Sequence, residues 1–191
     1  MSEKIYGKIS VQIRGLTPLL MNRLTSDMLK EGPTGPGKQY VPEEEARKAA
    51  YITKVDGKEQ LYVPARWIYA CMVKAAAMYK PKGKRYSMSS ILAGAMRIEP
   101  EEILMGHCNY EIDERPVVIS GARVLAWRPK MKEWSLDFSI VYNRVHIGGA
   151  AIPQLREILA DGGVRLGIGD FRPQHRGWFG TFEVARFEIE S

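Results

Sequence analysis

Residues 133–143 read EWSLDFSIVYN, and apolar and polar side chains alternate through the segment. One face carries Trp134, Leu136, Phe138, Ile140 and Tyr142. Successive side chains of a strand point to opposite faces of a sheet, so this alternation predicts a strand with one buried face. Residues 5–14 alternate in the same way, with isoleucine and valine on one side and mostly polar side chains on the other. Both segments are therefore predicted to be half-buried strands.

Working outward from these strands gives a recognisable order of elements. The predicted elements are strand 5–14, helix 65–79, strand 116–128, strand 133–143, helix 152–160 and strand 178–189. The second helix is expected to end at Gly162-Gly163, and residues 129–132 are expected to form the turn between the two middle strands. This βαββαβ order is that of the ferredoxin-like fold. We therefore expect an α+β domain whose four-stranded antiparallel sheet has two helices on one face and an open opposite face.

Two insertions interrupt this order. Residues 22–42 contain a cluster of glycine and proline, which predicts a flexible arm because such a segment buries little apolar surface. A short helix is expected at 43–51, and residues 52–63 are predicted to form a hairpin that turns at Asp56-Gly57. The 191 residues are expected to form a single domain.

The composition is that of a globular protein with excess positive charge. Of the residues, 45% are hydrophobic and 26% are charged, and the formal net charge is +6. Such an excess attracts polyanions, although it also serves solubility without any partner. The longest apolar stretch, within residues 65–79, is too short and too interrupted for a membrane span, and the N-terminal residues do not resemble a secretion signal. With Cys71 expected to be a buried thiol, we predict a cytoplasmic protein.

The segment most informative about function is residues 162–184, which read GGVRLGIGDFRPQHRGWFGTFEV. Glycine lets the backbone approach a phosphate closely, and the forked donors of arginine match phosphate oxygens. We predict a loop that contacts phosphates; the alternative is an ordinary glycine-rich loop before a core strand. The candidate binding residues are Arg165, Arg172, His175 and Arg176. The glycines expected to shape the loop are Gly167, Gly169, Gly177 and Gly180.

The end of this segment resembles a family signature. Residues 176–184, RGWFGTFEV, follow the form R-G-x-F-G-x-F-x-V, and GLTPLL at 15–20 follows the first strand. Together they resemble the RAMP superfamily, the ferredoxin-like RNA-binding and RNA-processing proteins of CRISPR systems; the middle of the chain is unmatched. The DFRP…FG ending is also similar to small phage-encoded proteins. The first resemblance implies RNA as the ligand, and the second implies a stand-alone relative that handles viral DNA.

Two further basic segments are candidates for contact with nucleic acid. Their residues are Lys80, Lys82, Lys84 and Arg85 in the first and Arg128, Lys130 and Lys132 in the second. The first set also fits a solvated helix end, and the second is expected at a hairpin tip flanked by Trp127 and Trp134. Trp134 is in phase with the core side chains of its strand. The outer face of strand 5–14 offers one aromatic side chain, Tyr6, so binding is expected to use backbone contacts with weak sequence specificity.

Several enzyme signatures are excluded or incomplete. Residues 32–38 have the spacing of a phosphate-binding P-loop, but Gln39 stands where Ser or Thr is required. His107 and Cys108 lack a partner pair at metal-ligand spacing, so no metal or cofactor is predicted. An RNA-cleaving member of the same superfamily is the enzyme alternative, with His175 as the candidate general base. Those enzymes usually carry this histidine nearer the first helix.

We predict a non-catalytic protein that binds single-stranded nucleic acid, DNA or RNA, through the glycine- and arginine-rich loop and the basic segments. The superfamily analogy implies self-association, with the arm packing on a neighbouring copy to build a filament along the strand. The remaining alternative is a protein-interaction module with no role in nucleic-acid binding.

Overall fold

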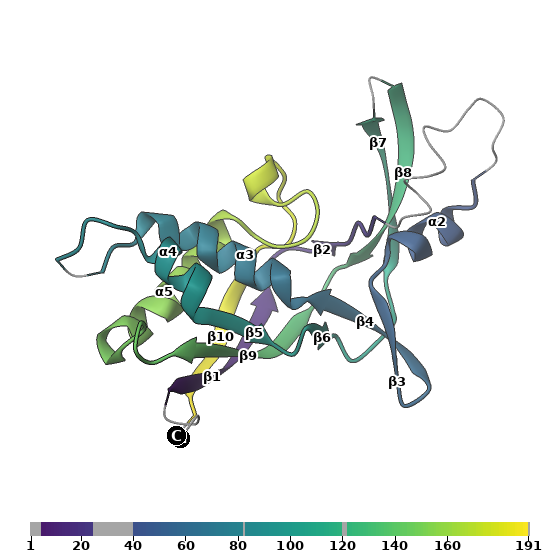
Figure 1. Ribbon diagram of the computed structural model, residues 1–191. Coiled ribbons are helices and arrows are strands. Elements are labelled where there is room, and N and C mark those ends of the chain that lie inside the picture. Colours follow the sequence, from purple (N-terminus) through teal and green to yellow (C-terminus); the bar gives the residue numbers. More distant parts are fainter. Residues whose placement is uncertain (1–4, 25–39, 82, 120–121, 191) are drawn as a thin grey trace.

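A four-stranded antiparallel sheet with the strand order β10-β1-β9-β5 forms the centre of the protein. The computed structural model describes residues 5–24, 40–81, 83–119 and 122–190, and the labels are those of Figure 1. In the sheet β1 (Tyr6–Gly15) pairs with β10 (Phe182–Ile189) on one side and β9 (Ser135–Asn143) on the other, and β9 also pairs with β5 (Met96–Glu99).

Two helices connect these strands and lie on the same face of the sheet. Helix α3 (Ala65–Ala75) comes between β1 and β5 in the sequence, and α5 (Ile152–Arg165) comes between β9 and β10. The helices pack against each other over the sheet, and the opposite face is open (Figure 1). The order β1-α3-β5-β9-α5-β10 is βαββαβ, so the expected α+β ferredoxin-like fold is confirmed.

The alternation in β1 and β9 builds the core. Fully buried side chains on the helix-covered face of these strands include Ile9, Val11, Ile13, Leu136 and Ile140. Trp134 is 5% exposed, and its indole N–H donates to the carbonyl of Thr17 at 2.8 Å, so this ring belongs to the core. On α3 burial raises the pKa of the Cys71 thiol to about 12, as expected for a core cysteine. Among the described residues, no helix has the length and apolar character needed to span a membrane.

The second strand of the sheet differs from the prediction. Residues 116–128 were expected there, but the position is taken by β5, which follows directly after α4 (Met88–Ala95). Its four residues include only two inward side chains, Met96 and Ile98, and a strand this short shows no periodicity in the sequence. The prediction therefore assigned the place to a longer segment with stronger strand character.

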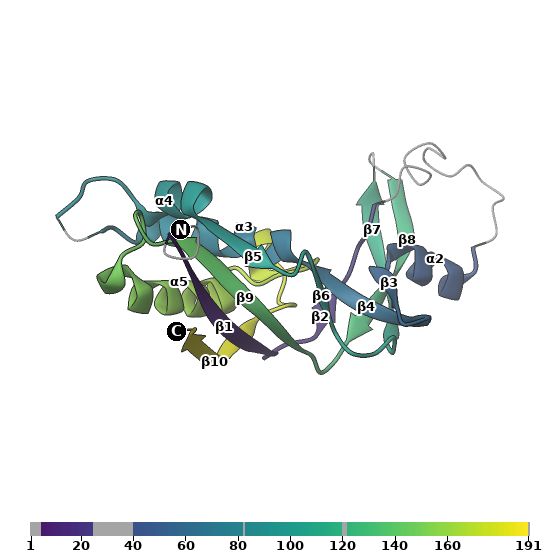
Figure 2. The ribbon, with the colours of Figure 1, turned by 60° about the horizontal axis from the view of Figure 1, so that its bottom comes forward.

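That longer segment belongs to a separate hairpin. Strands β7 (Glu111–Ile119) and β8 (Ala122–Met131) pair with each other, and β2 (Leu19–Leu20) pairs with β8 on its other side. Residues 129–132 are thus no hairpin turn, because Pro129 pairs with Ile112 inside the β7–β8 ladder. The chain crosses from one sheet to another between β8 and β9, and the β7–β8 hairpin projects from one end of the body (Figures 1 and 2).

Helix α5 continues through Gly162 and Gly163 instead of ending there. A Cβ at Gly162 would lie 2.9 Å from Sγ of Cys71, and one at Gly163 would lie 2.4 Å from the carbonyl oxygen of Phe182. These glycines therefore allow α5 to approach α3 and β10 closely. A glycine pair that indicated a helix end is in fact a packing site.

The remaining elements surround the base of the projecting hairpin. The predicted hairpin near 52–63 is formed by β3 (Ile52–Val55) and β4 (Lys58–Pro64), and β6 (Glu102–Leu104) extends this pair to three strands. Asp56 and Gly57 at its turn both have positive φ, as the Asp-Gly turn requires. Helix α2 (Pro42–Ala49) packs against β8. Residues 25–39 of the predicted arm lie outside the described residues.

The close approach at Gly163 is testable. We expect Gly163→Ala to lower the free energy of unfolding by about 1–3 kcal/mol, because the added Cβ would meet backbone that moves only with β10. Urea denaturation followed by circular dichroism measures the change. The matched control is Gly94→Ala in α4, where an added Cβ meets nothing within 4 Å. It should be neutral or stabilising by up to about 1 kcal/mol; equal losses in both variants would contradict the packing role.

Candidate nucleic-acid interface

The glycine- and arginine-rich segment forms a loop, residues 166–181, between α5 and β10. Gly167, Gly169 and Gly180 have φ between 66° and 77°, a region that other residues rarely adopt. At Gly180 a Cβ would also lie 1.8 Å from the carbonyl oxygen of Ile168. The loop therefore folds back on itself so tightly that glycine is required at this position.

The two sequence patches that resemble the RAMP superfamily lie side by side. The amide of Asp170 donates to the carbonyl of Leu20 at 2.8 Å, and the amide of Gly180 donates to the carbonyl of Pro18 at 2.8 Å. The hydroxyls of Thr17 and Thr181 are also 2.8 Å apart. The strand exit at 15–20 thus forms one wall of the loop, although the two segments are about 150 residues apart.

The base of the β7–β8 hairpin is fixed to the same loop. Arg128 of β8 forms an ion pair with Asp170, and both side chains are largely buried. Arg115 of β7 lies over two aromatic rings of the loop, 4.8 Å from the centroid of Phe171 and 5.0 Å from that of Phe179. Loop and hairpin are therefore one connected unit, held by an ion pair and cation–π contacts.

The four candidate residues of the loop have different environments. Arg165 lies in the last turn of α5 and binds the carboxylate of Asp161 at 2.7 Å. Arg172 points into the loop, where it donates to the carbonyl of Gly169, and burial lowers its pKa. These two arginines stabilise local structure. Arg176 and His175 are exposed, and neither has an ion-pair partner within the described part of the chain.

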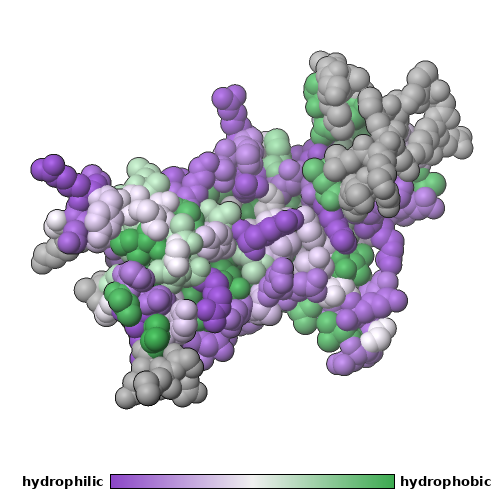
Figure 3. Space-filling model, viewed as in Figure 1, coloured by the Kyte–Doolittle hydropathy of each residue, from purple (hydrophilic) through white to green (hydrophobic). Residues whose placement is uncertain are grey.

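One candidate residue was missed in the sequence. Trp178 is 62% exposed, and its ring packs edge-on against Phe171 with centroids 5.1 Å apart. The sequence placed it at the start of the last strand, but β10 begins only at Phe182. The sequence feature that could have identified Trp178 is an aromatic residue two positions after an arginine in a glycine-rich loop. We call His175, Arg176 and Trp178 the loop ridge; the surface where this loop projects, at the upper centre of Figure 3, is hydrophilic.

The first basic segment lies away from the loop ridge. Lys80, Lys84 and Arg85 are exposed in the connection that leads to α4, at the opposite end of the molecule from the β7–β8 hairpin (Figure 1). Lys82 lies outside the described residues. The structure does not bring this segment together with the loop, so it would have to contact a different part of a strand.

The second basic segment is already engaged within the protein. It lies at the base of β8 and not at a hairpin tip. Arg128 pairs with Asp170, and Lys132 and Lys130 lie 2.7 and 3.7 Å from the carboxylate of Glu111. All three predicted cations therefore already have a carboxylate partner, and Lys130 and Lys132 share one.

Three of the four cations on the open face of the sheet are also paired, and the fourth, Arg14, is exposed. Arg186 binds Asp137 at 2.9 Å, Lys8 lies 3.5 Å from Glu190, and Arg97 binds Glu99 at 2.7 Å. A strand placed on this face would compete with these carboxylates. The loop ridge is the better candidate because it combines an exposed Trp178 with a cation, Arg176, that has no ion-pair partner among the described residues.

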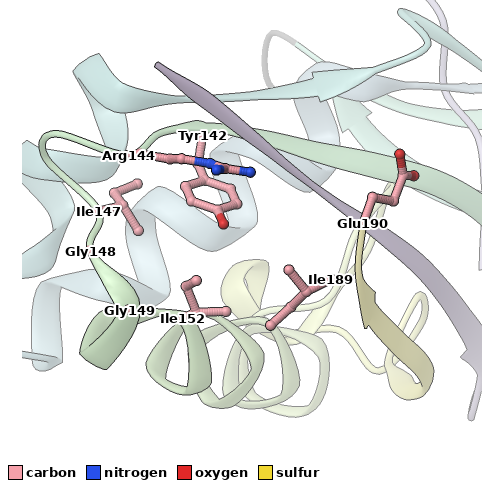
Figure 4. Close-up of a pocket in the computed structure, with 8 residues that line it drawn as sticks. All are labelled: Tyr142, Arg144, Ile147, Gly148, Gly149, Ile152, Ile189 and Glu190. Atoms are coloured by element: carbon pink, nitrogen blue, oxygen red, sulfur yellow. The ribbon is translucent and has the colours of Figure 1, made fainter. Parts of the chain in front are cut away.

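Two cavities among the described residues are lined by side chains other than the predicted binding residues. One, of about 410 Å³, lies beyond the ends of β9 and β10, where Figure 4 shows Tyr142 pointing between isoleucine side chains, with Arg144 and Glu190 at the rim. The other lies where β4 joins α3. Among the residues that the structure describes, no cluster of three or more His, Cys, Asp or Glu side chains is placed to hold a metal ion.

Comparison with known proteins connects this geometry to a fold family. No protein-family model matches the chain, and no curated protein matches it. Among 99 matching chains of solved structures is one from the cryo-EM structure of type III-B Cmr-beta bound to cognate target RNA. The TM-score is 0.56 at 14% identity, over 98% of this chain and 61% of that chain.

The chain shares its fold with this structural neighbour. The likeness covers almost the whole of this chain, including the unit formed by loop and hairpin, but this chain spans only about three fifths of its structural neighbour. The fold expected from the resemblance is therefore confirmed, while a relationship to phage-encoded proteins stays a prediction.

The link between loop and hairpin gives a second testable expectation. A double-mutant cycle with Arg128→Ala and Asp170→Ala should give a coupling free energy of about 1 kcal/mol or more, because the two side chains are only 15% and 30% exposed. The exposed pair Arg186 and Asp137 is the control, with expected coupling below about 0.5 kcal/mol. Additive effects at Arg128 and Asp170 would show that the hairpin is not held by this pair.

Proposed function

We propose that the protein binds single-stranded nucleic acid, RNA in the first place, through the loop ridge. The observation that carries the proposal is an exposed Arg176, without an ion-pair partner among the described residues, two positions before an exposed Trp178 on a loop whose shape is set by glycines. Cations beside aromatic rings suit single strands because phosphates pair with the first and bases stack on the second.

The construction of the loop favours binding by a preformed surface. Phe171 supports one edge of Trp178, and Arg115 packs against Phe171 from the hairpin side. A side chain that is already held loses little conformational entropy when a base stacks on it. The guanidinium of Arg176 presents forked donors to a phosphate without first breaking an ion pair. These contacts read backbone and ring faces, so sequence specificity from the ridge is expected to be weak.

The choice of RNA rests on likeness of fold. The structural neighbour is described as bound to cognate target RNA, and the sequence signature at 176–184 resembles that of RNA-binding proteins. Cleavage is not part of the proposal, because within the described residues no side chain orients the imidazole of His175 as a general base requires.

Fluorescence anisotropy with labelled single-stranded RNA and DNA of one sequence tests the proposal. Arg176→Ala should weaken binding and reduce the slope of log affinity against log salt by about 0.7 for each phosphate that the variant no longer neutralises. Trp178→Ala should weaken binding by roughly tenfold with little change in that slope. Arg186→Ala removes the same charge from the open sheet face and should leave binding unchanged. Absence of binding at low salt, or equal weakening in all three variants, would refute the proposal.

Self-association along the strand is the second part of the proposal. The β7–β8 hairpin projects from the body and exposes Val118 and Leu125, which are 68% and 51% accessible. Apolar side chains on a projecting hairpin fit contact with a neighbouring copy. Sedimentation velocity should show larger complexes as the oligonucleotide is lengthened, and Val118→Ser with Leu125→Ser should limit them to one copy. A protein that stays monomeric on long strands would contradict this.

A further inference from the structure

A cavity of about 430 Å³ lies where β4 leads into α3, and Arg23 and Leu24, which follow β2, also line it. Its polar and aromatic walls come from Arg23, Tyr51, Tyr62, Arg66, Glu101 and Glu102. Nothing in the sequence or in the loop geometry explains why two arginines, two tyrosines and two glutamates meet here.

The two arginines carry free positive charge. The guanidinium of Arg23 lies 5.8 Å from the centroid of the Tyr51 ring, and Arg66 donates to the hydroxyl of Tyr51 at 3.2 Å. Neither arginine has a carboxylate within ion-pair distance in the part of the chain that the structure describes. Arg66 also lies in the first turn of α3, which carries no acidic residue. This side of the cavity therefore favours an anionic group.

The aromatic wall consists of rings that pack edge-to-face. Tyr51 is 7% exposed and packs in this way against Tyr62 at 5.5 Å and Trp67 at 5.2 Å. Tyr62 is only half-buried and lines the cavity. A planar ring that entered would meet Tyr62, which is held on one side by the buried Tyr51.

Two carboxylates also line the cavity. Glu101 and Glu102 do so from the β6 side, and no ion pair within the described residues joins either of them to Arg23 or Arg66. Burial and the charge of Glu102 raise the pKa of Tyr62. A cavity that carries cations and carboxylates not paired with each other fits a ligand with an anion at one end and N–H donors at the other.

We propose that this cavity binds one nucleoside 5′-monophosphate unit. Its phosphate lies on Arg23 and Arg66, its base lies against Tyr62, and an amino group of the base donates to Glu101 or Glu102. Adenine, cytosine and guanine have such an amino group and uracil does not, so the site discriminates against uracil. The unit is either a free nucleotide or one nucleotide of a bound strand.

The position of the cavity links it to the loop. Arg23 comes three residues after Leu20, whose carbonyl accepts the hydrogen bond of Asp170 in the loop. Trp67, which packs on Tyr51, would lie 3.5 Å from a Cβ at Gly169. The wall of the cavity is therefore connected to the loop through Trp67 and the strand exit, and a strand bound to the loop ridge could place one nucleotide in it. Only this strand-bound form rests on the function proposed above.

Isothermal titration calorimetry with the 5′-monophosphates of adenosine, cytidine, guanosine and uridine, and with inorganic phosphate, tests the site. We expect the three amino-bearing nucleotides to bind about tenfold more tightly than the uridine nucleotide, which is the discrimination typical of hydrogen bonding to one base edge. Arg23→Gln with Arg66→Gln should abolish binding. Arg144→Gln, at the rim of the other cavity, removes a comparable charge and should change nothing.

Further variants distinguish a free nucleotide from a nucleotide within a strand, and they separate failure of the cavity proposal from failure of the loop-ridge proposal. Glu101→Gln with Glu102→Gln should remove the preference against uridine, and circular dichroism confirms that each variant is folded. If the Arg23 and Arg66 variant also reduces the preference of the protein for cytidine-rich over uridine-rich strands, the ligand is part of a strand; if strand binding is unaffected, it is a free nucleotide. No binding of any monophosphate by the unmodified protein, or equal binding of phosphate alone, would overturn the site, and the loop ridge would remain to be judged by its own variants.

Discussion

Asp170 holds together the three parts of the molecule that matter for the proposed function. Its amide bonds to Leu20 in the strand exit, and its carboxylate pairs with Arg128 at the base of the projecting hairpin. The next residue, Phe171, has φ of 49°, and this left-handed turn places its ring against Trp178 on one side and Arg115 on the other. The loop ridge therefore depends on Asp170, whose side chain is only 30% exposed.

This arrangement explains why most arginines of the loop are not available to bind a phosphate. The loop contains three arginines, but Arg165 and Arg172 are used to hold the helix end and the loop itself. An arginine that satisfies a carbonyl or carboxylate must break those bonds before it binds a phosphate, and that cost offsets much of the gain. Arg176 has no such bond within the part of the chain that the structure describes. The count of cations in a sequence is thus a poor guide to which of them contact a ligand.

The sequence predicts the parts of the fold that carry a long repeating pattern. The alternation at 133–143 and the helical spacing after Pro64 are read correctly because each extends over several turns or pleats. The short strand β5 has no pattern of its own, and its place in the sheet comes from pairing with β9 after α4. In the same way, the sequence makes Trp178 look like the first residue of the last strand. That strand begins only at Phe182, because Gly180 forms hydrogen bonds with Pro18 and Ile168 instead of joining the sheet. In both cases the structure depends on hydrogen bonds to residues that are distant in the sequence, and the residue types of a short segment do not reveal them.

Affinity and discrimination would then come from different surfaces of one unit. A ridge of arginine and tryptophan contacts any single strand, because every nucleotide has a phosphate and a base with a ring face. Discrimination between bases requires groups that meet the base edge, and carboxylates are the acceptors that distinguish amino-bearing bases. Such carboxylates weaken binding if they lie beside the phosphate-binding cations, since opposite charges within reach neutralise each other. In the cavity lined by Arg23, Arg66, Glu101 and Glu102, no ion pair within the described residues joins the arginines to the carboxylates, so both pairs would be available to the same nucleotide.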